Sequence, residues 1–346
     1  MRYGSVCSGI EACTMGWHHL EWEPAFFSEI DDFPRAVLQY HYPQVPLHGD
    51  FTTVGADDYG SIDLLVGGTP CQSFSVAGLR GGMADERGNL ALEYLKLAQR
   101  KRPRWLVWEN VPGVLSSNGG RDFGAFLGGL VECGYGFAYR VLDAQYFGVA
   151  QRRRRVFVVG YLGDWRRAAA VLFERESLSG HPAPSRETGE RIAPAVTTGP
   201  PFSRTGNERV ECEAIVPVTA RMRGFGDAAA AGENVSSTLR SADPMAVAFA
   251  QNARDEVREM PYSGALSANP GMKQTSYVRE GLSVRRLTPT ECERLQGFPD
   301  GFTQIPYRNK PAEKCPDGPR YKALGNSMAV PVMRWIGEKI LQVDNR

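Results

Sequence analysis

The sequence has few of the features that mark whole classes of protein. Its seven cysteines are odd in number and never form a Cys-x-x-Cys pair, which argues against a disulfide framework and a zinc-finger site. It has no apolar run of roughly eighteen residues, and its first residues lack a charged segment followed by a long apolar core. We therefore expect a protein without a membrane span, in a reducing cytoplasm.

The sequence also has no excess of one sign of charge, because its net charge is only +1 over 346 residues. That balance is not typical of a protein that simply coats nucleic acid. Two local runs are basic. Arg100–Arg104 falls at an expected helix end, where cations favour the helix dipole. Gln151 and the four arginines after it run directly into the apolar segment Val156–Gly160, so they are harder to explain as a solvated surface.

Strand-like and helix-like segments alternate over residues 1–164, with Ser8–Ala12 opening the first helix. Such alternation predicts an α/β fold with a doubly wound, mostly parallel sheet. Thr288, Pro289 and Glu291 predict a capped helix start, and a last helix is expected from about Val330 to Val343. The expected strands are Tyr3–Cys7, Ala25–Glu29, Ile62–Gly67, Trp105–Glu109, Phe137–Leu142 and Val156–Gly160, and the other expected helices are Asp32–Tyr40, Asn89–Arg100 and Phe123–Cys133.

The composition changes between about residues 165 and 280, where Ala, Gly, Pro, Ser and Thr become prominent. Three similar short segments, Ile192–Thr198, Val235–Arg240 and Ser263–Ala268, read as strands between turns. We expect a smaller, irregular, β-rich region here; a partly ordered linker is the alternative.

A candidate nucleophile stands at the end of the third expected strand. The apolar run Ile62–Val66 leads into Gly67–Cys71, and ligand sites of open α/β sheets lie at the carboxyl ends of strands. A buried, inert thiol is the commoner fate of a free cysteine, so Cys71 needs support from elsewhere in the chain. The glycine-containing segment Ser73–Gly88 that follows suggests a mobile lid, or else an ordinary surface loop.

Five segments taken together in this order resemble the motifs of the DNA (cytosine-5)-methyltransferase family, of bacterial or phage type. The resemblance covers nearly the whole chain apart from roughly residues 165–280. The segments are Pro70-Cys71, Glu109-Asn110-Val111, Gln151–Arg155, Arg286–Pro299 and Tyr321–Ser327.

The resemblance implies four catalytic residues. Cys71 would attack carbon 6 of cytosine, which activates carbon 5 to accept a methyl group. Glu109 would act as the acid near ring nitrogen 3, which requires a raised pKa or a proton shared with the base. Arg153 and Arg155 would hold the carbonyl oxygen of the base and the catalytic geometry. Because the target atom is hidden in stacked DNA, the cytosine would be flipped out, with Ser73–Gly88 closing over it.

The resemblance also implies S-adenosylmethionine as methyl donor and no metal. Ser8, Gly9 and Ile10 match the first cofactor turn, although Cys7 replaces an aromatic residue and Glu11 replaces a glycine of the family pattern. Glu29 would bind the ribose and Asp50 the adenine amino group, while carboxylates at strand ends otherwise often cap helices. Asn326 and Ser327 match a segment that faces the cofactor.

The expected organisation has two lobes with double-stranded DNA between them. Residues 1–165 and 321–346 would form the catalytic and cofactor-binding domain, and residues 166–320 the target-recognition domain that reads base edges. We expect a monomer. A cognate restriction endonuclease, a stand-alone role and a phage-encoded role all remain open.

Four other interpretations are weighed against this one. A zinc nucleobase deaminase would explain His19-Leu20-Glu21 and Pro70-Cys71, but Phe74 stands where the second cysteine ligand belongs. An amino-directed DNA methyltransferase would need a polar residue where Gly199 precedes Pro200-Pro201-Phe202. A tRNA enzyme with the same carbon 5 chemistry is less compatible with the long 165–280 segment. A non-catalytic, DNA-binding relative stays open because of the altered cofactor turn.

Overall fold

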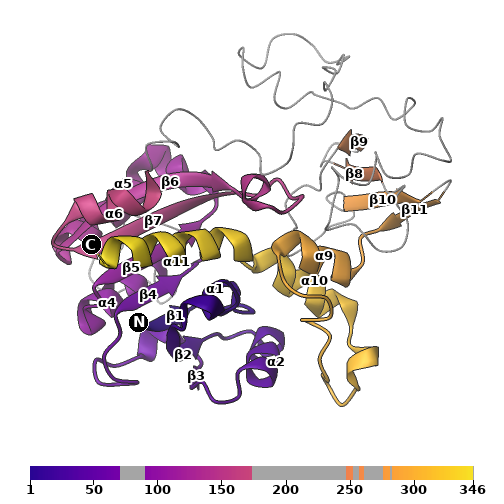
Figure 1. Cartoon of the computed structure of the whole chain (residues 1–346), viewed down its shortest axis with the longest axis horizontal. Helices are drawn as coiled ribbons and strands as arrows, with labels where there is room; N and C mark the ends of the chain where they lie inside the picture. Colours follow the sequence, from indigo (N-terminus) through magenta and orange to yellow (C-terminus); the bar gives the residue numbers. More distant parts are fainter. Residues whose placement is uncertain (71–89, 174–246, 252–256, 261–275, 281–282, 346) are drawn as a thin grey trace, which may run out of the picture.

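The computed structural model describes residues 1–70, 90–173, 247–251, 257–260, 276–280 and 283–345. Its main feature is a seven-stranded sheet in the order β3-β2-β1-β4-β5-β7-β6 (Figure 1). All neighbours in it are parallel except the pairs formed by β7, which runs antiparallel to β5 and β6. The strands are β1 Arg2–Val6, β2 Glu23–Ser28, β3 Leu47–His48, β4 Leu64–Gly67, β5 Trp105–Asn110, β6 Tyr135–Asp143 and β7 Arg154–Leu162.

Helices cover both faces of this sheet, and each face has its own hydrophobic core. Alternate residues of the strands point to opposite faces, so Leu64 and Val107 pack with one core and Leu65 and Leu106 with the other. Helices α1, α2, α6 and α11 contribute to the first core, and α4 and α5 to the second. These helices are α1 Ala12–Trp17, α2 Asp32–His41, α4 Leu90–Lys101, α5 Arg121–Glu132, α6 Trp165–Leu172 and α11 Val330–Asp344. The prediction of a doubly wound, mostly parallel α/β sheet is confirmed.

A second, smaller sheet is entirely antiparallel, with the order β11-β10-β8-β9. It is followed in the chain by helices α9 and α10, which lie between the small sheet and the large one in Figure 1. The three short segments expected to be strands within residues 192–268 lie outside the described residues. The elements are β8 Val247–Gln251, β9 Val257–Met260, β10 Ser276–Glu280, β11 Ser283–Arg286, α9 Pro289–Gln296 and α10 Asp317–Asn326.

Most predicted elements are found within a few residues of their expected ends, but the first helix starts late. Ser8–Ala12 was expected to open it, whereas α1 begins at Ala12. The reason is that Gly9 and Glu11 have left-handed backbones, with φ of 57° and 62°, which are incompatible with a right-handed helix. In the part of the chain that the structure describes, no helix is both long and apolar enough to cross a membrane.

Candidate active site

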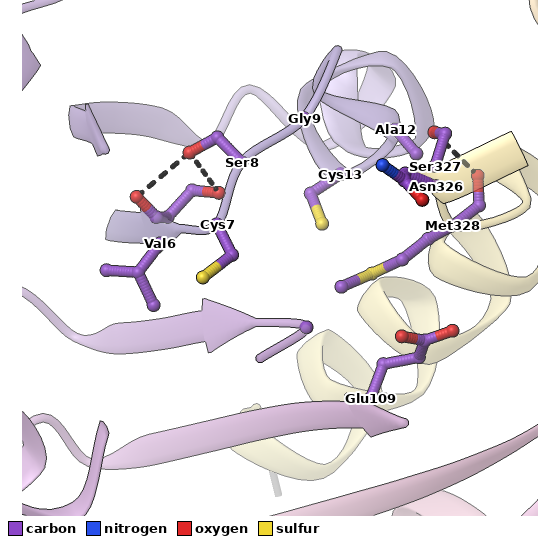
Figure 2. Close-up of a pocket in the computed structure, with 12 residues that line it drawn as sticks. Val6, Cys7, Ser8, Gly9, Ala12, Cys13, Glu109, Asn326, Ser327 and Met328 are labelled. Carbon is purple, nitrogen blue, oxygen red and sulfur yellow. Dashed lines mark hydrogen bonds between the residues drawn. The ribbon is translucent and has the colours of Figure 1, made fainter. Parts of the chain in front are cut away.

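The carboxyl ends of β1, β4 and β5 meet at one edge of the sheet, because these neighbouring strands are parallel. A cavity opens at this edge, bounded by the turn after β1, the loop after β4, the end of β5 and the segment after α10 (Figure 2). The cavity therefore gathers five of the predicted site residues, Ser8, Gly9, Glu109, Asn326 and Ser327. The other lining residues are Ser5, Val6, Cys7, Ala12, Cys13, Gly68 and Met328.

Glu29, at the carboxyl end of β2, holds the turn after β1 in place. Its Oε2 accepts a hydrogen bond from the Gly9 amide at 2.8 Å. Its Oε1 accepts from the amides of Ile30 and Asp31, at 2.8 and 2.9 Å. The carboxylate is thus fixed by backbone donors beside the predicted cofactor turn.

The remaining predicted cofactor residues lie around this turn rather than on the cavity wall. Asp50 is exposed and caps a short 3-10 helix, accepting from the Thr52 amide at 2.9 Å. The Ile10 side chain is fully buried in the hydrophobic core. Cys7 does line the cavity, and burial raises the pKa of its thiol to about 12, with the charges of Glu29 and Asp50 adding to the effect. Cys7 is therefore a neutral thiol near both carboxylates.

Glu109 is the acidic side chain on the cavity wall. It is only 8% exposed, and its Oε1 lies 3.1 Å from Nε of Arg155. Burial raises the pKa of Glu109, and the charges of Arg155 and Arg153 act in the opposite direction. A carboxyl in such a place keeps its proton to a higher pH than a free one, as a general acid requires.

The two predicted arginines make different contacts. They come from the start of β7 and the residues before it, at the edge where β5 ends, because β7 is antiparallel to β5. Arg155 contacts Glu109, whereas buried Arg153 donates from Nη2 to the Ser327 carbonyl at 2.7 Å and from Nη1 to the Gly325 carbonyl at 3.3 Å. Burial also lowers the pKa of Arg153 to about 9. Arg153 thus fastens the end of α10 to the site.

The loop that leads to Cys71 is fixed by the end of β5. Thr69 accepts from the Trp108 indole at its hydroxyl and from the Asn110 side chain at its carbonyl, both at 2.9 Å. Sequence reasoning missed the roles of Thr69 and Trp108, although both are neighbours of motif residues. Cys71 itself and the segment Ser73–Gly88 lie outside the described residues, so their arrangement stays a prediction.

A metal site was not expected, and the deaminase alternative would need one. In the described ranges, no three His, Cys, Asp or Glu side chains gather in a way that could hold a metal ion. His19, part of the partial deaminase signature, lies 2.9 Å from Glu338 of α11. That contact accounts for His19 without a metal.

Comparisons with known proteins agree with this geometry. Residues 1–342 match the family described as C-5 cytosine-specific DNA methylase. The chain is 36% identical to a protein of Escherichia phage P1 named DNA N-6-adenine-methyltransferase, over 98% of this chain but only 61% of the length of that protein. It is 30% identical to the type II methyltransferase M.SsoII of Shigella sonnei, over 98% of this chain and 80% of the relative.

The fold has a counterpart among solved structures. The Dnmt2 methyltransferase of S. pombe superposes with a TM-score of 0.62 over 100% of both chains, at 16% identity. At that identity the likeness concerns the fold alone. The match over residues 1–342 establishes the family: this chain belongs to the C-5 cytosine-specific DNA methylases, which transfer a methyl group from S-adenosylmethionine to cytosine in DNA.

Proposed function

We propose that this protein methylates carbon 5 of a flipped-out cytosine within a specific sequence of double-stranded DNA, through a covalent adduct at Cys71. The observation that carries the proposal is the buried Glu109 carboxyl. It lies beside Arg155, its pKa is raised by burial, and it shares one cavity with the turn after β1. A proton donor and a cofactor-type turn in one cavity are what this chemistry needs.

In the proposed mechanism, the Cys71 thiolate forms a bond to carbon 6 while Glu109 gives a proton to ring nitrogen 3, which leaves an enamine with a nucleophilic carbon 5. S-adenosylmethionine supplies the methyl group that carbon 5 accepts. A base then removes the proton from carbon 5, ring nitrogen 3 returns its proton to Glu109, the carbon 6–sulfur bond breaks, and the Cys71 thiolate is restored. Arg155 orients Glu109 and the base, while Arg153 keeps the Asn326–Met328 segment in position.

The residues around the cavity suit the methyl donor. Glu29 presents a fixed carboxylate for ribose hydroxyls at the end of the second strand of the sheet, and Asp50 lies near Cys7 for the adenine amino group. Ser8, Gly9, Asn326 and Ser327 complete the wall. Residues 1–165 with 321–346 would form this catalytic domain, and residues 166–320 would read the target sequence.

The name of the phage P1 relative raises adenine as another target. This chain spans 61% of that relative, so an adenine-directed activity of that protein can reside in its unmatched part. Within this chain, Gly199 offers no side-chain acceptor for an exocyclic amine before Pro200-Pro201-Phe202. Cytosine is therefore the favoured target.

Base-resolution methylation sequencing tests the proposal. DNA from a methylation-free host expressing the protein should carry 5-methylcytosine in one short sequence context, and none when Cys71→Ala is expressed at the same level. Methylated adenine, or no DNA methylation from a folded wild-type protein, would contradict the proposal.

A further inference from the structure

The segment at the end of α10 is held in place by hydrogen bonds to its backbone carbonyls. Asn326, Ser327 and Met328 line the cavity, and the last carbonyls of a helix find no partner within the helix itself. Arg153, which precedes β7, donates to the carbonyls of Ser327 at 2.7 Å and Gly325 at 3.3 Å. The position of this part of the cavity wall therefore depends on donors from other elements.

A second donor to the same carbonyl comes from helix α9. Gln296 is the last residue of α9 and is fully buried, and its Nε2 donates to the carbonyls of Leu324 at 2.6 Å and Ser327 at 3.3 Å. Because carbonyl oxygens only accept, these partners fix which end of the amide faces the wall. The Ser327 carbonyl is thus bonded both by Arg153, next to the large sheet, and by Gln296.

The other end of the Gln296 amide is not satisfied. Its Oε1 is buried and accepts no hydrogen bond from the described residues. A buried acceptor without a partner costs at least as much stability as one hydrogen bond contributes. The stability gained from the two Nε2 bonds is therefore offset within the same side chain, which points to a role of Gln296 in placing the wall rather than in stabilising the fold.

Helix α9 connects the cavity wall to the small sheet. Strand β11 ends at Arg286 and α9 begins at Pro289, so only two residues separate them. One of these, Leu287, is buried, and its carbonyl accepts a hydrogen bond from the Tyr321 hydroxyl of α10 at 2.6 Å. A displacement of the small sheet would therefore carry α9 with it, and Gln296 would pass the displacement to the cavity wall.

We propose that Gln296 is a positioning residue that couples target binding by residues 166–320 to the binding of S-adenosylmethionine in the cavity. The inference rests on the proposed function, which supplies both the cofactor and the DNA-reading region. When DNA fixes the small sheet, Gln296 holds the Asn326–Met328 wall where the methyl donor binds. Without its amide, only the Arg153 bond remains on the Ser327 carbonyl. Since coupling between two ligands is reciprocal, each ligand should then strengthen the binding of the other less than in the wild type.

The test is a coupling factor, defined as the ratio of the dissociation constants of S-adenosylhomocysteine without and with saturating DNA. Isothermal titration calorimetry measures both, because this product of methyl transfer allows no turnover; the DNA is a duplex carrying the sequence context found by methylation sequencing. Gln296→Met removes the donor and keeps the volume, and Gln296→Asn withdraws the amide by one methylene. Thr288→Ala is the matched control, since it weakens the cap of α9 without a contact to the wall. Circular dichroism shows whether each variant is folded.

We expect DNA to strengthen the binding of S-adenosylhomocysteine to the wild type, and both Gln296 variants to lose about three- to tenfold of this coupling factor, the range for one hydrogen bond. Thr288→Ala should keep the wild-type factor. An unchanged factor in the Gln296 variants, an equal loss in Thr288→Ala, or a wild-type affinity that does not depend on DNA would overturn the inference and leave the proposed function standing. A wild-type protein that methylates no cytosine in DNA would overturn both.

Discussion

At the scale of single residues, the chemistry of this site depends on the balance of burial and charge at Glu109. Burial is the largest influence on its pKa and raises it, while Arg155 and Arg153 lower it. If the arginines dominated, the carboxyl would be ionised at neutral pH and could not give a proton. The raised pKa means that the proton is held at a pH where a free carboxyl has lost it.

Replacing this carboxyl should slow the chemical step. We expect Glu109→Gln to lower the single-turnover methyl-transfer rate by about 10²- to 10⁴-fold, the range for loss of one general acid. The affinity for S-adenosylmethionine should stay within about twofold of wild type, because the same volume lines the cavity. Radiolabelled methyl transfer at saturating DNA measures the rate, and Glu132→Gln, at an exposed glutamate on α5, is the control.

The pH dependence gives a second readout of the same variant. Because the pKa of Glu109 is raised, the protonated, active form is present at low pH and is lost as pH rises through that value. The wild-type rate should therefore contain a step that falls with rising pH and that is missing in Glu109→Gln. An identical pH profile in both proteins would argue against the acid role.

At the scale of elements, the end of β4 and the loop after it place two successive glycines against different kinds of neighbour. A Cβ on Gly67 would lie 2.6 Å from Val6 Cγ2 and 2.9 Å from the Val6 carbonyl oxygen, which belong to β1. A Cβ on Gly68 would lie 3.0 Å from Oε2 of Glu109 and 3.0 Å from Cε of Met328. At Gly67 the space for a side chain is limited by the neighbouring strand β1, and at Gly68 it is limited by side chains of the site.

These neighbours predict that the two substitutions by alanine change different properties: one lowers the reaction rate, and the other lowers the stability. Gly68→Ala should cost little stability, because flexible side chains can move, but should lower the methyl-transfer rate about tenfold or more by displacing Glu109. Gly67→Ala should instead lower the free energy of unfolding by about 1–3 kcal/mol, as overpacking does. Urea denaturation and single-turnover rates measured side by side separate the two. A destabilised but fully active Gly68→Ala would contradict this assignment.

Helix α9 carries the cap that its sequence predicted. The Thr288 hydroxyl accepts from the Glu291 amide at 3.3 Å, and the Glu291 carboxylate accepts from the Thr288 amide at 2.7 Å. We expect Thr288→Ala to lower the free energy of unfolding by about 1 kcal/mol. Urea denaturation measures it, and Thr290→Ala, in the same turn but without a capping bond in the structure, should change it by less than about 0.5 kcal/mol.

At the scale of the whole molecule, helices near the two ends of the chain pack against each other. Helix α11 packs against α1 (Figure 1). The Trp17 indole donates to the Met333 carbonyl at 2.6 Å. The close approach depends on Gly337, where a Cβ would lie 2.4 Å from the Trp17 ring. The cofactor turn between β1 and α1 is therefore supported from behind by the C-terminal end of the chain.

Substitution of Gly337 tests how closely α11 packs against α1. We expect Gly337→Ala to lower the free energy of unfolding by about 1–3 kcal/mol, because the rigid, buried indole cannot yield without cost. Near-UV circular dichroism should report the altered Trp17 environment, and urea denaturation the stability. Gly318→Ala is the control, since a Cβ there would meet nothing within 4 Å. Equal stability of the two variants would show that the α1–α11 contact is looser than the structure has it.

Local patterns in the sequence were enough to predict a large part of the fold and the family. Strand and helix periods predicted β1, β2, β4–β7, α1, α2, α4, α5, α9 and α11, but not β3, α6, α10 or the strands of the small sheet. The Thr288–Glu291 pair predicted a cap, and the spacing of five motifs indicated the family. Each helix, strand, cap or motif depends on residues within a few positions of one another, so it can be recognised in the sequence without knowledge of the fold. The roles of Cys71 and the lid, and the division into 1–165 with 321–346 and 166–320, stay predictions.

The contacts between residues far apart in the sequence became visible only in the folded structure. Arg153 bonds carbonyls at Gly325 and Ser327, more than 170 positions away, and Trp108 holds Thr69. The late start of α1 follows from the left-handed Glu11, whose carboxylate is held by Ser5 and Thr14. The physical reason is that the same glutamate or arginine serves as acid, anchor or helix cap according to its burial and partners, which exist only once the chain has folded.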